Sequence, residues 1–247
     1  MQLEYVPLLK IQRELYESPR GMERFEAYIK TMVDAETRDL KLPLSSMNPM
    51  GKDHLPKLLD EYLAFHADEL AAQSVEEAEA NLTNIDGKFK VTLVLSDDLM
   101  GGWTNRYTVE FGHRSGSAAY FKRGWFTGML WTSLQPTPEL VRREVLITVY
   151  RGAHIVAHGF ATTLGGLLAQ EGYAMAMANC QTPTLDADDL AYTEEIISPF
   201  LDSKDYPILL TCLFGDEAAK ALGYAPMGLS RNAGLALTLS QTKKKFG

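Results

Sequence analysis

Apolar residues recur at helical spacing through the first 80 residues. Between residues 55 and 70 they follow one face of a helix, at Leu55, Leu58, Leu59, Tyr62, Leu63, His66 and Leu70. This spacing predicts one amphipathic helix, and His66 lies on its apolar face as a core histidine. Residues 7 to 36 indicate two shorter helices separated at "SPRG", where Ser18 can cap a helix and Pro19 fits its first turn. We therefore predict a helical N-terminal part over residues 1–80.

The pattern changes to alternation between residues 88 and 115. "GKFKVTLVLSDD" alternates and is rich in β-branched residues, and "GGWTNRYTVEFGHRS" sets Thr, Tyr, Val and Phe between glycine-bearing turns. These segments predict two or three strands, and we expect a small antiparallel sheet near residues 88 to 126. Asp97 and Asp98 between the strands are interpreted as a turn-forming pair, because neighbouring side chains on a strand point to opposite faces.

A clear helix start follows at Thr137, with Pro138 and Glu139 in the first turn. From Val145 onward the segment is apolar almost all round, which predicts a buried helix over 138–158. A second helix capped by Thr162 or Thr163 and a further helix near 188–201 come next. The predicted fold is α+β and mostly helical, with the small antiparallel sheet packed on the buried helix. We expect a single domain over 1–247 with a helical C-terminal part at 179–247.

Candidate chemistry gathers on the buried helix and its successor. His154 and His158 are four residues apart, so a helix directs both imidazoles to one side. Zinc in catalytic sites commonly takes a third ligand from another segment, often a carboxylate, and Glu171 lies on the next predicted helix. These three residues form the candidate metal site, with zinc as the candidate cofactor. The alternative is a buried helix pair without metal, in which Glu171 pairs with Arg151 or Arg123.

The segments "HIVAH" and "AQEGYAMA" carry a resemblance to a known family. They resemble the HExxH helix and the downstream Glu helix of gluzincin-type metallopeptidases, over roughly residues 88–178, which we name the zincin-like core. The resemblance implies His154, His158 and Glu171 as metal ligands. The general base of that family, the Glu directly after the first histidine, is Ile155 here, and isoleucine cannot carry a proton.

The function expected from this resemblance is a metallopeptidase-related domain with its general base replaced, which binds a metal or a peptide. Whether it is an enzyme stays open, and no catalytic residue is assigned. The competing hypothesis is a ligand- or protein-binding module without metal that uses the aromatic and basic segment 113–131. Its candidate binding residues are His113, Arg123 and Trp125, with Tyr173 from the downstream helix, because cations and aromatic rings together can line a groove.

Charge and hydropathy limit the classes of partner that we expect. The chain has 247 residues and a net charge of −8, and its basic cluster is the terminal "KKKFG", so no nucleic-acid partner is expected. No apolar run approaches the roughly 20 residues that span a bilayer, and the first residues lack a secretory signal pattern. We therefore expect a cytoplasmic protein without membrane partners. Cys180 and Cys212 lie in apolar surroundings, which predicts buried free thiols.

Overall fold

The structure is a computed structural model that describes residues 1–99, 105–115 and 118–246. The chain divides into two compact units. Unit 1 comprises residues 1–110 and 117–149, and unit 2 comprises residues 111–116 and 150–247. The division falls inside two helices, α5 (Arg106–Arg114) and α7 (Pro138–His158).

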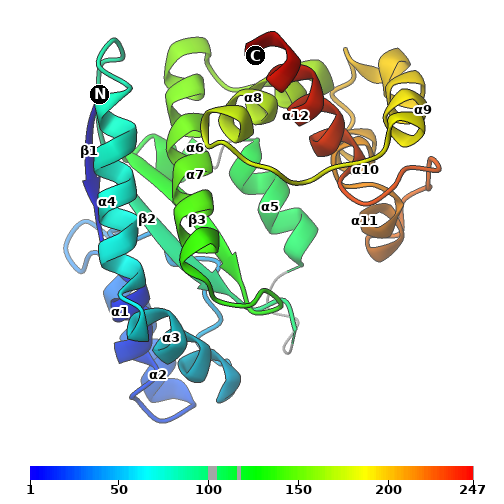
Figure 1. The fold of residues 1–247 in the computed structure, drawn as a ribbon. Helices are drawn as coiled ribbons and strands as arrows, with labels where there is room; N and C mark the ends of the chain where they lie inside the picture. The colour runs from blue at the N-terminus through cyan, green and yellow to red at the C-terminus, as the bar shows by residue number, and fades with distance from the viewer. Residues whose placement is uncertain (100–104, 116–117, 247) are drawn as a thin grey trace. The chain divides into compact units, whose positions relative to one another are not determined.

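Unit 1 contains a three-stranded sheet in the order β1-β2-β3 (Figure 1). The strands are β1 (Gln2–Tyr5), β2 (Lys88–Ser96) and β3 (Trp125–Trp131). Both neighbouring pairs run parallel, with Gln2 opposite Lys88 and Lys90 opposite Trp125. The predicted antiparallel sheet is therefore wrong, although a mostly helical α+β chain with a small sheet agrees with the structure.

The parallel arrangement follows from what connects the strands. Parallel neighbours need a long crossover, and here helices fill both connections. Residues 106–114, expected as a strand, form helix α5, and α6 (Ala118–Phe121) follows it before β3. Residues 100–104 of the expected hairpin lie outside the described residues. The β-branched and aromatic residues of "RYTVEF" favoured a strand, but strand propensity is weak and yields to packing.

The helices before β2 agree with the sequence pattern, except around His66. Helices α1 (Leu8–Leu15) and α2 (Met22–Met32) form where two short helices were predicted. The predicted start of the second helix is wrong, because α2 begins at Met22 with Gly21 as its N-cap, and Ser18 does not cap it. The single helix expected from residue 55 is instead two helices, α3 (His54–Ala64) and α4 (Ala67–Ala80). His66 separates them with a left-handed backbone, φ 58°. Its side chain is 79% exposed, so its prediction as a core histidine is wrong.

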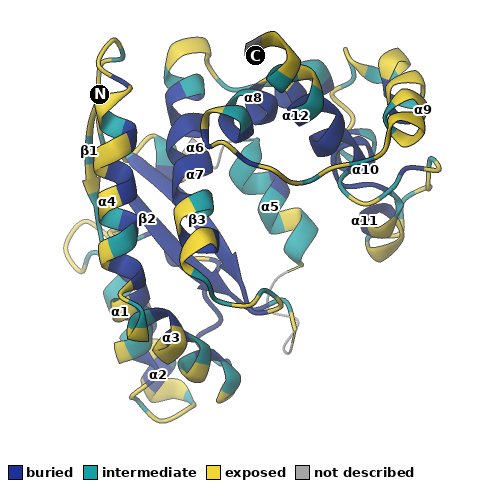
Figure 2. Cartoon of the chain, viewed as in Figure 1, coloured by how far each residue is buried: buried dark blue, intermediate teal, exposed yellow. Residues whose placement is uncertain are grey.

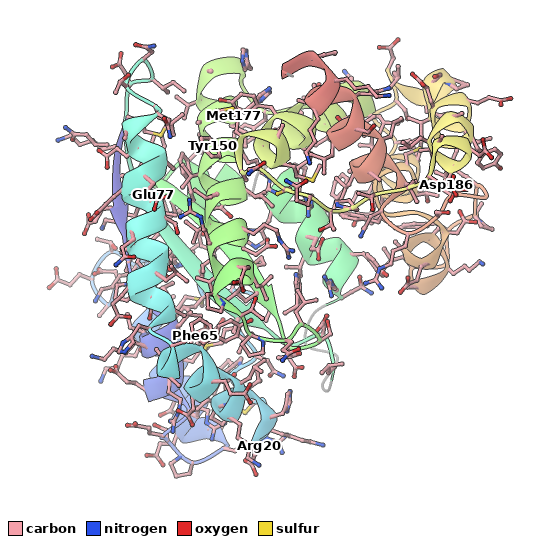
Figure 3. All side chains as sticks on the ribbon, in the orientation of Figure 1. Arg20, Phe65, Glu77, Tyr150, Met177 and Asp186 are labelled. Atoms are coloured by element: carbon pink, nitrogen blue, oxygen red, sulfur yellow. The ribbon has the colours of Figure 1, made fainter. Side chains whose placement is uncertain are left out.

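One face of the sheet is covered by α4 and the first part of α7, which lie side by side in Figure 1. Glu77 of α4, labelled in Figure 3, forms an ion pair with Arg142 of α7 at 2.5 Å. Gly128 of β3 lets α7 approach closely, because a Cβ there would lie 2.6 Å from Thr148 Oγ1. Figure 2 shows β3 buried throughout and β2 buried from Val91 onward, so the core of unit 1 includes the space between the sheet and these helices.

A buried glutamine continues the sheet where β1 stops. β1 has four residues and β2 has nine, so the end of β2 lacks a strand on that side. The Gln12 amide replaces it: its Nε2 donates to the Leu95 carbonyl at 3.0 Å, and the Leu95 N–H donates to its Oε1 at 2.8 Å. A side-chain amide thus satisfies both main-chain groups of a buried strand residue.

Unit 2 is built from the end of α7 and the helices that follow it. These are α8 (Leu164–Met177), α9 (Ala187–Ile197), the 3₁₀ turn η1 (Ser198–Phe200), α10 (Tyr206–Phe214), α11 (Asp216–Ala221) and α12 (Ala233–Phe246). Thr163 caps α8, and Thr137 caps α7 in unit 1, so both predicted helix starts are confirmed. Gly172 allows α8 and α12 to pack tightly, since a Cβ there would lie 2.4 Å from Thr238 Oγ1. Cys180 and Cys212 are buried free thiols, as predicted.

Candidate functional site

Helices α7 and α8 bring His154, His158 and Tyr173 together in unit 2. The ring centroids of the two histidines are 4.6 Å apart, and those of His154 and Tyr173 are 5.4 Å apart. His154 is half-buried, and His158 is exposed in the last turn of α7. The Nδ1 atom of His154 is buried and has no hydrogen-bond partner among the described residues. The spacing of four therefore does place both imidazoles on one side of the helix.

Glu171 of α8 is fully buried and held by two arginines. Arg151 makes a fork to the carboxylate, with Nε donating to Oε1 at 2.7 Å and Nη2 donating to Oε2 at 2.9 Å. Arg114 donates to Oε2 as well, and Gln170 Nε2 donates to Oε1 at 3.1 Å. We name these four residues the Glu171 cluster. Of the alternatives left open by the sequence, the pairing of Glu171 with Arg151 is present.

The Glu171 cluster is anchored by the end of α5. Gln170 Nε2 also donates to the Arg114 carbonyl at 2.5 Å. The Arg114 guanidinium lies 5.7 Å from the centroid of the Phe214 ring, a cation–π distance. Phe111 packs edge-on against Tyr206 at 4.8 Å between centroids. These contacts explain why residues 111–116 belong to unit 2, although most of α5 precedes them.

Charge and burial set the protonation of these groups. Burial alone would raise the pKa of Glu171, but the charges of Arg151 and Arg114 outweigh it and lower that pKa to about 2. Burial lowers the pKa of His154, and the neighbouring His158 lowers it further. Burial also raises the pKa of Tyr173. At neutral pH the unit therefore holds an ionised Glu171 next to a neutral His154 and a neutral Tyr173.

These residues do not fit the catalytic zinc ion that the sequence resemblance implies. Both oxygens of Glu171 accept hydrogen bonds from guanidinium groups, which carry the same sign of charge as a metal ion and repel it. Within residues 1–99, 105–115 and 118–246, no three His, Cys, Asp or Glu side chains are placed to hold a metal. The imidazole pair alone offers two ligands, whereas catalytic zinc usually has three from the protein.

Ile155 occupies the position at which the sequence resemblance implies a general base. Its side chain is 5% exposed and belongs to the core, one residue along the helix from His154. A carboxylate at this position would have to leave the core to reach the histidines, or be buried without a partner. The local packing of α7 is thus suited to an apolar residue here.

The candidate binding residues of segment 113–131 are divided between the two units. His113 belongs to unit 2, whereas Arg123 and Trp125 belong to unit 1, and residues 116–117 between them lie outside the described residues. Arg123 donates from Nε to Asp39 at 2.7 Å. Trp125 is buried at the start of β3 and lies 5.4 Å from the Lys90 ammonium.

A buried polar cluster at the carboxyl end of β2 escaped the sequence analysis. Asp97, which is 2% exposed, accepts hydrogen bonds from His54 Nε2 and from Asn48 Nδ2, both at 3.1 Å. Thr132 Oγ1, just after β3, lies 3.1 Å from Asp97 Oδ1 and 3.0 Å from Asp98 Oδ1. Arg106 donates to Asp98 at 3.0 Å. We name these six residues the Asp97 cluster.

A buried loop positions the histidine and the amide of the Asp97 cluster. Tyr16 donates to the Asn48 carbonyl at 2.6 Å, and Asn48 Oδ1 accepts from the Met50 N–H at 3.1 Å. Gly51 fits this path without a shift of its neighbours, because a Cβ there would lie 2.0 Å from a methyl carbon of Leu55 and 3.1 Å from the Asn48 carbonyl oxygen. The missed signal was two carboxylates directly after a central strand, where parallel sheets collect polar residues. Because we expected a hairpin at this point, we interpreted Asp97 and Asp98 as turn residues.

Comparison with known proteins gives one informative match. No protein-family model matches the chain, and no solved structure matches it. The chain is similar to the uncharacterised protein YjfC of Bacillus subtilis (strain 168), with 25% identity over 198 residues. The match covers 76% of this chain and 64% of YjfC, so it spans somewhat less than two thirds of that relative. Within the described residues, no helix has the length and apolarity needed to cross a membrane.

Proposed function

We propose that unit 2 is a zincin-like helix pair that binds a peptide or protein segment and does not cleave peptides. The observation that carries the proposal is the Glu171 cluster, in which two guanidinium groups neutralise the carboxylate that the resemblance assigns to a metal. A buried carboxylate is costly unless it is paired, and the arginines supply the pairing that a metal ion would otherwise supply.

The accessible chemistry of the helix pair suits binding. His154 and Tyr173 are half-buried and His158 is exposed, so two imidazoles and a phenol are open to a ligand in part. Imidazole and phenol groups each offer a hydrogen bond and an apolar ring, which is typical of surfaces that bind polypeptide. Ile155 cannot take a proton from water, so hydrolysis lacks its base.

The test is a peptidase assay with quenched fluorescent peptides, with added zinc and with a chelator. We expect no chelator-sensitive cleavage by the unmodified protein. Ile155→Glu restores the HExxH spacing, and its stability and activity distinguish binding without cleavage from metal-dependent cleavage. In the binding account the new carboxylate is buried without a partner, so the variant loses several kcal/mol of stability and stays inactive.

Two results would contradict the proposal. One is rapid, chelator-sensitive cleavage by the unmodified protein. The other is an Ile155→Glu variant that keeps its thermal stability and gains zinc-dependent cleavage. Ile155→Gln serves as the matched control, because it has the size of the glutamate variant without its charge.

A further inference from the structure

The outer edge of β1 in unit 1 has free main-chain groups. Figure 1 shows β1 as the last strand on one side of the sheet, and in Figure 2 it alternates between exposed and intermediate residues, in contrast to the buried β3 and the buried part of β2. The ladder to β2 uses the N–H groups of Gln2 and Val6, at 2.8 Å each. Alternate residues of a strand point to opposite sides, so Leu3 and Tyr5 direct their N–H and C=O groups outward. No described residue forms a hydrogen bond with those groups.

An open groove lies beside this edge, at the start of the three strands. Its volume is about 510 Å³, and we name it the β1 groove. It is lined by Gln2 and Glu4 of β1, by Lys88 and Lys90 of β2, and by Arg123 and Gly124 before β3. The register places Gln2 opposite Lys88 and Glu4 opposite Lys90, so these four side chains share one face of the sheet.

The charges of the β1 groove are arranged unevenly. Arg123 is engaged with Asp39, and the Lys90 ammonium lies 5.4 Å from the centroid of the Trp125 ring. Lys88 and Glu4 form no ion pair with any described residue. The face next to the free edge therefore has an unpaired cation, Lys88, beside Gln2. It also has an unpaired carboxylate, Glu4, two residues further along β1.

We propose that the outer edge of β1 binds an extended segment of a partner protein, which joins the sheet as a fourth strand and carries an acidic and a basic side chain two residues apart. The acidic side chain lies next to Gln2 and reaches Lys88, and the basic one lies next to Glu4. The main-chain groups of Leu3 and Tyr5 pair with the segment.

This occupant follows from the combination of edge and charge. An unpaired edge strand is a template for another chain, and addition of a strand is a recurring way to bind peptides. Main-chain pairing supplies affinity without sequence preference, and the side chains beside it supply the preference. A segment with two acidic residues on this face would place one of them next to Glu4, and the two like charges would repel. A segment with one acidic and one basic residue avoids this repulsion. This site lies in unit 1 and is independent of the function proposed for unit 2.

The test measures fluorescence anisotropy of a labelled octapeptide that alternates valine with polar residues and carries one glutamate and one lysine two positions apart. We expect saturable binding to the full chain, and binding several-fold weaker for a peptide with two glutamates. Lys88→Glu should weaken binding of the first peptide several-fold and favour a peptide with two lysines. Equal binding of all these peptides, or no binding of any, would overturn the proposal.

Leu3 offers a matched pair of variants. Leu3→Pro removes the outward N–H but none of the donors that β1 uses for β2, and Leu3→Ala keeps the N–H and removes the same side chain. We expect about tenfold weaker binding for Leu3→Pro and a change below about twofold for Leu3→Ala. Equal binding by the two variants would overturn the proposal. If Leu3→Pro fails to fold, the Lys88→Glu result decides.

Light scattering of the same proteins tests for another occupant. We expect a mass that does not change between the unmodified protein and Leu3→Pro. A dimer that becomes a monomer in Leu3→Pro but not in Leu3→Ala would overturn the proposal, because the edge would then be taken by a second copy of this chain.

Discussion

The two units each bury carboxylates, but they stabilise them by different means. In unit 2, Glu171 is held by two guanidinium groups, so its charge is more than balanced. In unit 1, Asp97 is held by an imidazole, an amide and a hydroxyl, and the one arginine of its cluster contacts the neighbouring Asp98. A buried carboxylate can be satisfied by two guanidinium groups or by a set of smaller donors, and the two solutions fail differently when a partner is removed.

The largest effect is expected from Arg151→Met. The variant leaves Glu171 buried with one arginine and removes a fork of two hydrogen bonds. Loss of one partner of a buried ion pair costs roughly 3–5 kcal/mol. Chemical denaturation of the purified variant measures this loss in the free energy of unfolding. Arg143→Met on the same helix is the control, because Arg143 is 38% exposed and should cost below about 0.5 kcal/mol. Equal losses for the two variants would contradict the structural role of Arg151.

Asp97→Asn should have a smaller effect than Arg151→Met. The substitution keeps the shape of the side chain but turns one acceptor oxygen into a donor, which faces His54, Asn48 or Thr132. Lost or mismatched hydrogen bonds of a buried group cost about 1–3 kcal/mol. The same denaturation measurement applies. A loss larger than that of Arg151→Met would show that the charge in unit 1 matters more than the donors around it.

The stability contributed by Glu171 should depend on pH in one direction. Its pKa in the folded chain is about 2, below the ordinary value of 4.5, so the stabilisation is complete above pH 4.5 and is lost as the pH falls towards 2. The difference in unfolding free energy between the unmodified protein and Glu171→Gln should therefore narrow as the pH is lowered from 6 to 3. A difference that widens on acidification would contradict the assigned ionisation.

His66→Gly should give the smallest effect, and a favourable one. His66 has φ 58° and a side chain that is 79% exposed, and its contact with Glu69, at 3.8 Å from Nδ1 to Oε1, lies at the surface, so little packing offsets the left-handed conformation. Glycine adopts that conformation freely, and we expect a gain of about 0.5–1 kcal/mol in thermal or chemical unfolding. A loss of similar size would show that His66 has a contact role that its exposure conceals.

The sequence predicted the elements that depend on local signals. The caps at Thr137 and Thr163, the helix over 138–158 and strand 88–96 all arise from local residue chemistry and form as expected. β1 was missed because four residues carry too little pattern. α5 was taken for a strand because its β-branched and aromatic residues pack as a helix only in the tertiary context.

The part of the candidate site that depends on local spacing was predictable from the sequence. The spacing of His154 and His158 fixes their common side of α7, and the structure has them 4.6 Å apart. The sequence did not determine the partners of Glu171, because Arg114 reaches it from α5 and Arg151 reaches it from α7. The Asp97 cluster depends on strand direction, which hydrophobic pattern does not specify.

The ionisation of Glu171 tests most directly whether arginine serves as its counter-ion. Carbon-13 NMR of its side-chain carboxyl, assigned with Glu171→Gln, follows protonation and metal contact at one atom. We expect a carboxylate that stays ionised to the lowest pH at which the chain is folded, because its pKa is about 2. We also expect a signal that does not respond to added zinc. A carboxyl that titrates near its ordinary value of 4.5, or shifts as zinc is added, would contradict the claim that arginine serves as its counter-ion.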